Sequence, residues 1–209
     1  MKNLLVFGFT FTLGIVLAFN ANAAGNAAKG KAAYAVCLAC HGADGMGNKD
    51  LNSPKIAGLS AWYLERQLKN FKAGLRGANP KDNFGMQMRP MALTLPNDQA
   101  IADMAAYVSN MPEKKISSNV SGDANAGKAA YMLCQACHGA NGGGNKALNA
   151  PRLAGQHDWY LVRQLKNFKA GIRGTKTGDT YGAQMRPMAM TLANDETVKN
   201  VAAYIATFK

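Results

Sequence analysis

The chain repeats itself once, and this repeat limits its fold more than any other feature of the sequence. Residues 25–112 align with residues 122–209 at a constant offset of 97, without insertion, and 51 of the 88 paired positions are identical. Two copies are too few for a solenoid, which needs about three or more stacked repeats. The sequence therefore predicts two tandem domains, at residues 24–112 and 122–209, joined by a short polar linker at residues 113–121.

The first 23 residues have the composition of an export signal. Lys2 provides a positive start, residues 4–19 are an apolar run, and residues 21–23 read Ala-Asn-Ala, which matches a small-residue cleavage site. A membrane-spanning helix needs ~20 apolar residues, so a signal peptide over residues 1–23 is favoured over a retained anchor. Export predicts a periplasmic location for the rest of the chain.

The spacing of apolar residues predicts helices and gives no strand pattern. In the first half we expect helices over residues 27–37, 61–73 and 98–107, separated by loops rich in glycine or containing proline. Leu64, Leu68 and Phe71 fall on one face of the middle helix. The second half repeats this reading, so the predicted fold class is all-α.

Each half carries one C-x-x-C-H motif, at residues 37–41 and 134–138. Two thiols at this spacing can form thioether bonds to the two vinyl groups of one haem, and the next residue, histidine, then binds the iron. The sequence predicts two covalently bound haem c groups, attached through Cys37, Cys40, Cys134 and Cys137 and bound on one axial side by His41 and His138.

Three other uses of these cysteines fit the sequence less well. A redox-active C-x-x-C would need a β-α-β context, and the strands are missing from the pattern. A zinc site usually has four Cys or His ligands, but the first half has only Cys37, Cys40 and His41. Disulfides, which export permits, would leave the recurrent histidine unexplained.

The second axial ligand can be narrowed by elimination. The only other histidine is His157, and its counterpart in the first half is Ser60, so two-histidine ligation is excluded there. Methionine is the usual alternative in cytochromes c. Two methionine pairs are kept at the 97-residue offset, Met88 with Met185 and Met91 with Met188. The residues alone leave both pairs open.

With its signal peptide, tandem domains and two C-x-x-C-H motifs, the chain resembles the cytochrome c4 family over its whole mature length. In that family the axial methionine lies in a loop before the last helix of each domain, eight residues ahead of the position held here by Pro96 and Ala193. The resemblance therefore implies Met88 and Met185 as the axial ligands, with Met91 and Met188 as the alternative.

The resemblance also implies how the proximal histidines are held. The family has a Pro-Lys-x-Ala-Gly stretch after the haem motif, present here at residues 54–58 and, with arginine for lysine, at residues 151–155. The carbonyls of Pro54 and Pro151 would accept a hydrogen bond from the histidine Nδ1. The first and last helices of each domain would cross, in the first half at Gly30, Tyr34 and Tyr107.

The chain is basic, with 24 Lys and Arg against 12 Asp and Glu. On the middle helix Lys69, Lys72 and Arg76 fall on one side, as do their copies Lys166, Lys169 and Arg173. This face is interpreted either as a docking surface for an acidic redox partner or as an ordinary solvated surface. Arg89 and Arg186, beside the axial methionines, are candidates to pair with haem propionates. Export argues against a nucleic-acid partner.

A haem with both axial positions filled transfers electrons and has no vacancy for a substrate. The sequence thus predicts an electron-transfer protein, not an enzyme, without a small-molecule substrate. The family resemblance implies a periplasmic carrier between a quinol-oxidising respiratory complex and a terminal oxidase, in transient contact with membrane complexes. The alternative is the cytochrome subunit of a larger periplasmic dehydrogenase. A two-haem peroxidase is disfavoured, because both halves keep the same methionines.

Overall fold

A computed structural model describes residues 24–208, so the signal peptide predicted over residues 1–23 lies outside the described residues. Within this range the chain forms ten helices: α1 (Ala27–Ala33), α2 (Ala35–His41), α3 (Ala61–Lys72), α4 (Asn83–Leu93), α5 (Asp98–Ser109), α6 (Ala124–Tyr131), α7 (Gln135–His138), α8 (Asp158–Lys169), α9 (Thr180–Met190) and α10 (Asp195–Ala206). The only extended pairings in residues 24–208 are two isolated bridges, one in each half. The predicted all-α fold class is confirmed.

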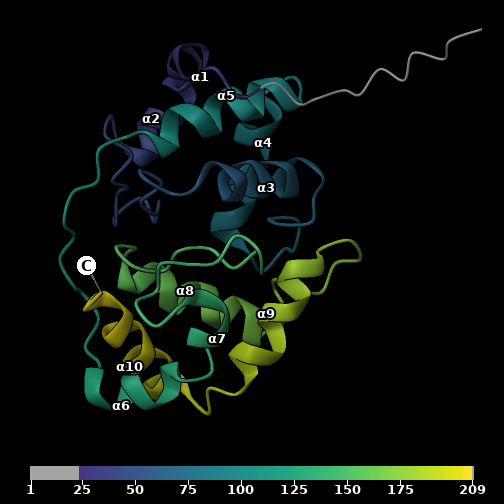
Figure 1. Ribbon diagram of the computed structural model, residues 1–209. Coiled ribbons are helices and arrows are strands. Elements are labelled where there is room, and N and C mark those ends of the chain that lie inside the picture. The colour runs from purple at the N-terminus through teal and green to yellow at the C-terminus, as the bar shows by residue number, and fades with distance from the viewer. Residues whose placement is uncertain (1–23, 209) are drawn as a thin grey trace, which may run out of the picture.

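The two halves stack on each other, with α3 and α8 facing across the boundary (Figure 1). Helices α1 and α5 lie at one end of the molecule, α6 and α10 lie at the other, and the linker runs along the outside. None of the described helices has the length and apolar character needed to cross a membrane.

Within each half the first and last helices cross at a glycine, as expected. A Cβ atom added to Gly30 in α1 would overlap the Asp103 carbonyl of α5 and come within 2.8 Å of the Tyr107 Cβ. Beside this crossing the rings of Tyr34 and Tyr107 meet edge to face with centroids 5.3 Å apart. Gly127 repeats the arrangement against Asn200 of α10. The missing side chain is what allows the two backbones to touch.

Helices α4 and α9 were not expected, because each contains a glycine and a proline. Pro90 lies inside α4 and Pro187 inside α9, where proline removes a backbone hydrogen bond. The Asp82 side chain caps α4 by accepting from the Gly85 N–H at 3.0 Å, and Ala92 is fully buried. Capping and tertiary packing therefore outweigh the weak helix propensity. The stretch that carries the candidate methionines is a helix, not a loop.

Two pairs of reciprocal contacts join the halves. Arg66 of α3 donates to the Asn149 side chain at 3.2 Å and to its carbonyl at 2.9 Å. Arg163 of α8, at the equivalent position, donates to the carbonyl of Asn52 at 3.1 Å and also to its side chain. In each half the same arginine therefore binds the same asparagine of the other half. The interface has approximate two-fold symmetry as a result.

One buried carboxylate ties the linker to the second half. Asp158, the first residue of α8, accepts from the Ser118 hydroxyl at 2.7 Å and from the backbone N–H groups of Asn119 and Val120 at 2.6 and 2.8 Å. Burial alone would raise the pKa of Asp158, but these hydrogen bonds, with one from Trp159, hold it below the ordinary value of 3.8. The ionised carboxylate is therefore the form that holds the linker.

We expect Asp158→Ala to free this linker and to lower the free energy of unfolding by about 2 kcal/mol, since hydrogen bonds to a charged group are lost. Limited proteolysis between residues 113 and 121 should become faster, and urea unfolding gives the stability. Because the folded pKa is lowered, the contribution is complete above about pH 4 and disappears as the pH falls through the folded value. Ser118→Ala, which removes one donor only, should show a smaller effect, and equal effects of the two changes would contradict this account.

Candidate haem sites

Each C-x-x-C-H histidine ends a short helix and is held from behind by a proline carbonyl. The Nδ1 atom of His41 lies 2.8 Å from the Pro54 carbonyl oxygen, and that of His138 lies 2.7 Å from the Pro151 oxygen, which confirms the implied hydrogen bonds. Burial lowers the pKa of both imidazoles, and the bond to proline opposes this only in part. A neutral ring that donates from Nδ1 leaves the lone pair on Nε2 free for a metal.

The proline carbonyl is placed by a tight loop that we call the Pro54 loop, residues 45–57. Gly47 has a φ of +82° and packs so closely that an added Cβ would lie 2.5 Å from the Pro54 carbonyl carbon. The Gly47 N–H donates to the His41 carbonyl at 2.9 Å, and the Gly45 carbonyl accepts from Ile56 and Ala57. The loop and the histidine are therefore fixed to each other through the backbone.

The paired cysteines lie three residues apart on the short helical segment before each histidine. The first of each pair, Cys37 or Cys134, is partly buried, the second, Cys40 or Cys137, is exposed, and none of the four forms a disulfide. Burial, followed by the neighbouring Cys40, raises the pKa of Cys37 to about 11. Each thiol pair thus spans from the interior to the edge of the site, as attachment to two substituents of one ring requires.

One continuous hollow, partly open to solvent, runs between the halves. His41 and Met88 line it from the first half, and His138 and Met185 line it from the second. Its walls are mainly apolar, with Phe71 and Phe168 among them. An apolar hollow that brings a histidine and a methionine from each half together fits two haems.

The hollow is basic where the halves meet, with six Lys or Arg side chains and two Asp side chains in its lining. Arg76 and Arg173 are 8% and 9% exposed, and their hydrogen bonds go to neutral groups: Arg76 to Gln67 and to the Tyr160 hydroxyl, both at 2.7 Å, and Arg173 to Gln164 at 2.5 Å. The Nε atoms of both arginines are buried and have no partner among the described residues.

The chemistry of these two arginines points to an anion. Burial would raise the pKa of Tyr160, yet Arg76 and Arg173 hold it below its ordinary value of 10. Buried charges are normally paired, and haem propionates are anions of the right kind. The residues present therefore fit haem on three counts: apolar walls, neutral imidazoles and a buried cationic cluster.

One expectation about charge is wrong. Arg76 and Arg173 were expected on a basic face with Lys69 and Lys72, but both are buried at the interface. Lys69 is paired with Asp98 at 2.7 Å, and Lys72 donates to the Leu95 carbonyl. These residues do not form a free docking surface, because their side chains bind acceptors within the chain itself. Arg89 and Arg186 do not line the hollow, and Arg89 lies beside Gly74, so the structure favours Arg76 and Arg173 over them as partners of the haem propionates.

The contacts that two further residues make across the interface were not predicted from the sequence. Gln156 and His157 of the second half donate to the Pro54 loop of the first, at the carbonyls of Lys55 and Met46. The available signal was that three consecutive positions, Leu59-Ser60-Ala61, become Gln156-His157-Asp158 inside an otherwise well-kept repeat.

Fold and site together define a c-type cytochrome with two haem-binding domains, and the cytochrome c family model matches residues 27–112 and 124–209. Cytochrome c4 of Azotobacter vinelandii is 36% identical over 88% of this chain and 90% of its own length. A thiosulfate dehydrogenase electron acceptor of Stutzerimonas stutzeri is 34% identical over 81% of this chain and 77% of its own length. The crystal structure of reduced recombinant cytochrome c4 from Pseudomonas stutzeri superposes with a TM-score of 0.71 and 33% identity, covering 89% of this chain and all of that one.

The chain belongs to the cytochrome c4 family. It is an electron-transfer protein, not an enzyme, that carries two covalently bound haem c groups on its two C-x-x-C-H motifs and works with redox partners.

Proposed function

We propose that His41 and Met88 are the axial ligands in the first half and that His138 and Met185 are those in the second. All four side chains line the hollow. Met91 does not line it, and Met188, which does, is 44% exposed, whereas Met185 is partly buried. A thioether ligand must be drawn out of water towards the iron, so burial favours Met88 and Met185 over their neighbours.

Haem c, when bound, supplies a reversible one-electron couple. The chain's residues set the conditions for it. His41 and His138 offer a neutral Nε2 while the proline carbonyls fix the ring orientation, which raises the donor strength of the imidazole. Met88 and Met185 would supply the second ligand to each iron, which would leave no position for a substrate. The apolar walls limit access of water, and Arg76 and Arg173 balance the propionate charge.

The single observation that carries the proposal is that both sites open into one hollow. The two histidine and methionine pairs border the same hollow, so two haem groups bound there would share one compartment. We infer that electrons pass directly between the halves and that the chain holds up to two electrons. An electron received at one half can then leave from the other.

We propose that the chain is a periplasmic carrier that takes electrons from a quinol-oxidising respiratory complex and passes them to a terminal oxidase. The domains proposed at residues 24–112 and 122–209 would each carry one haem, and the linker at residues 113–121 would join them. The net charge of +12 favours partners with acidic docking surfaces, because opposite charge steers a transient encounter.

Membranes that contain the quinol-oxidising complex and the oxidase, washed free of small cytochromes, test this function. Adding the purified holoprotein should restore oxygen uptake with quinol as donor, and the rate should fall about tenfold or more as salt is raised, as for steered association. Oxygen uptake that stays at the washed level, or a rate independent of salt, would count against the shuttle and against acidic partners respectively.

The alternative, a cytochrome subunit of a larger periplasmic dehydrogenase, is favoured by the similarity to a thiosulfate dehydrogenase electron acceptor. A permanent subunit should co-purify with its dehydrogenase in fixed ratio at high salt, whereas a free carrier should elute alone. Size-exclusion chromatography of the native protein from its own periplasm distinguishes the two functions.

We expect Arg76→Gln to lower the midpoint potential of one haem by about 60 mV, equivalent to a tenfold change for one electron. The cation lies in the hollow, where it would stabilise the reduced state, and a low dielectric strengthens its effect. Spectroelectrochemical titration measures the shift. Arg89→Gln is the matched control, since Arg89 does not line the hollow, and equal shifts in the two variants would contradict the role given to Arg76.

A further inference from the structure

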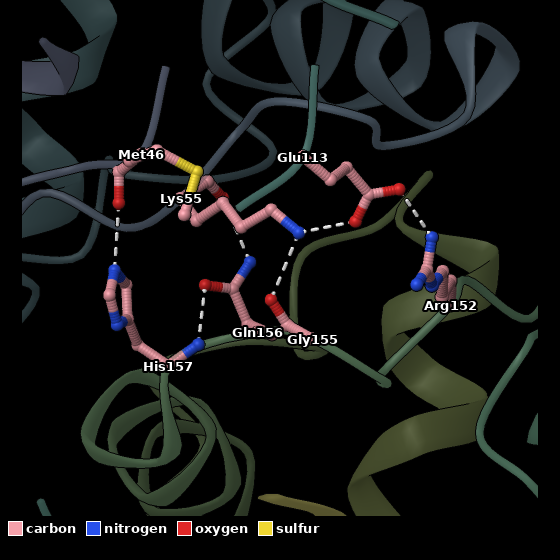
Figure 2. Close-up of polar contacts among 7 residues, drawn as sticks. All are labelled: Met46, Lys55, Glu113, Arg152, Gly155, Gln156 and His157. Carbon is pink, nitrogen blue, oxygen red and sulfur yellow. Dashed lines mark hydrogen bonds and ion pairs between the residues drawn. The ribbon is translucent and has the colours of Figure 1, made fainter. Parts of the chain in front are cut away.

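The second half departs from the repeat at three adjacent positions, and all three gained polar side chains that bind elsewhere in the chain. Leu59 of the first half packs against its own core, and the Ser60 side chain makes no capping hydrogen bond. Their counterparts reach across the interface. Gln156 Nε2 donates to the Lys55 carbonyl at 2.8 Å, and His157 Nε2 lies 2.8 Å from the Met46 carbonyl oxygen (Figure 2).

These two contacts form one unit. The Gln156 Oε1 atom accepts from the backbone N–H of His157 at 2.9 Å, so the backbone at His157 orients the Gln156 amide towards Lys55 (Figure 2). Because the Met46 oxygen is a carbonyl and can only accept, His157 must carry its proton on Nε2. Stacking on Trp159, with ring centroids 5.3 Å apart, fixes the plane of the imidazole.

Both acceptors belong to the Pro54 loop. Met46 lies between Gly45, whose carbonyl accepts from Ile56 and Ala57, and Gly47, whose N–H donates to the His41 carbonyl. Lys55 directly follows Pro54. The second half therefore holds this loop at two carbonyls, one on either side of the oxygen that accepts from His41. A third cross-contact runs the other way, from the buried Lys55 ammonium to the Gly155 carbonyl at 3.0 Å.

Apart from the Lys55 contact to Gly155, the first half does not support the equivalent loop in the same way. The equivalent loop of the second half, residues 142–154, has its corresponding carbonyls at Gly143 and Arg152. Within residues 24–208, no side chain of the first half donates to either carbonyl, because Leu59 has no amide to offer and Ser60 is too short. The reciprocal arginine contacts to Asn52 and Asn149 act on both loops alike, so they do not offset this difference.

We propose that Gln156 and His157 are positioning residues through which the second half stiffens the proximal-ligand loop of the first, and that they thereby make the two haem sites unequal. The inference rests on the proposed axial role of His41. A stiffer loop keeps the Pro54 carbonyl on the His41 Nδ1 proton for a larger part of the time. A hydrogen bond that is formed for more of the time makes the imidazole a stronger electron donor to the iron. A stronger donor favours the oxidised iron, so the potential of the first haem alone would be lowered.

Exchange of the histidine Nδ1 protons with solvent tests the proposal in the reduced holoprotein. The two signals are followed by NMR and assigned through contacts within each half. In the native chain the His41 proton should exchange more slowly than the His138 proton. Gln156→Leu, which restores the residue of the first half, and His157→Leu should each speed exchange at His41 about fivefold, the factor expected for one typical hydrogen bond, and leave His138 unchanged. The midpoint potential of the first haem should move upward in both variants.

Two matched variants separate positioning from general loosening of the interface. His157→Gln keeps a donor near the Nε2 position and should retain slow exchange. Asp158→Ala removes a side chain whose hydrogen bonds go to residues 118–120 and Trp159 and not to the Pro54 loop, and it should leave both exchange rates unchanged. Equal acceleration at His41 and His138, or no change at His41 in either leucine variant, would overturn the proposal. The axial assignment is tested apart from it, because His41→Ala should alter the absorption spectrum of one haem whether or not the loop is braced.

Discussion

Met88→Ala is expected to remove the weak absorption band near the red edge of the oxidised spectrum from one haem and to leave the other haem's band intact. Met88 is a partly buried methionine that lines the hollow with His41, and this band reports the bond from thioether sulfur to iron. Since two ligands of the same kind contribute, about half of the amplitude should disappear, and the potential of the affected haem should fall. Met185→Ala should remove the other half.

Met91→Ala and Met188→Ala are the matched controls for this experiment. Each removes a methionine three residues further along the same helix, so helix propensity and composition change in the same way. Both variants should keep the full band in a visible spectrum. If Met91→Ala abolished half of the band while Met88→Ala kept it, the assignment of the axial ligands would be wrong although the fold would stand.

Gly30→Ala is expected to lower the free energy of unfolding of the first half by about 3 kcal/mol, near the upper end of the usual cost of overpacking. The added methyl group would overlap the Asp103 carbonyl, which is backbone and cannot swing aside, so α1 and α5 must separate. Alanine favours a helix over glycine by about 1 kcal/mol, and this gain is too small to compensate. Gly127→Ala should have the same effect in the second half, through Asn200.

Urea unfolding followed by circular dichroism measures both glycine variants. Gly143→Ala is a suitable control, because Gly143 has an ordinary φ and the repeat places Met46 at the equivalent position. It should leave stability nearly unchanged. A Gly30→Ala protein as stable as the native chain would mean that the two helices do not cross in contact at this residue.

The repeat, the cysteine spacing and the apolar periodicity together predicted most of the fold and many of the residues of the haem sites. Helix α3 was expected over residues 61–73 and ends at Lys72, and α5 was expected to end at residue 107 and continues to Ser109. Such features are local, so a short window of sequence contains them. Helix α4 was missed because glycine and proline lower its propensity, and the packing that stabilises it involves α3, which is distant in sequence.

The residues that surround the haem sites were harder to predict from the sequence. Arg76 was expected on a solvated face, yet it is buried against Tyr160 and Gln164 of the other half, 84 and 88 positions away in sequence. Arg76 lies beyond the end of α3 at Lys72. A charged residue is normally exposed, and only the stacking of the halves reverses this expectation. Lys69 and Lys72 look free in the sequence because Asp98 and the Leu95 carbonyl, their acceptors, belong to the segment that packs beside them.

The sequence by itself determined that two haem-binding domains follow each other and that each attaches its haem through neighbouring thiols, since these properties depend on residues a few positions apart. Only the tertiary structure decided how nearly identical halves become different. Gln156 and His157 meet acceptors 101 and 111 positions away, and the arginine cluster forms only where the two halves meet, Arg76 against Tyr160 and Arg173 against Gln67. Contacts of that range depend on how the halves are placed against each other, which is fixed by the packing of the whole interface and by no single stretch of residues.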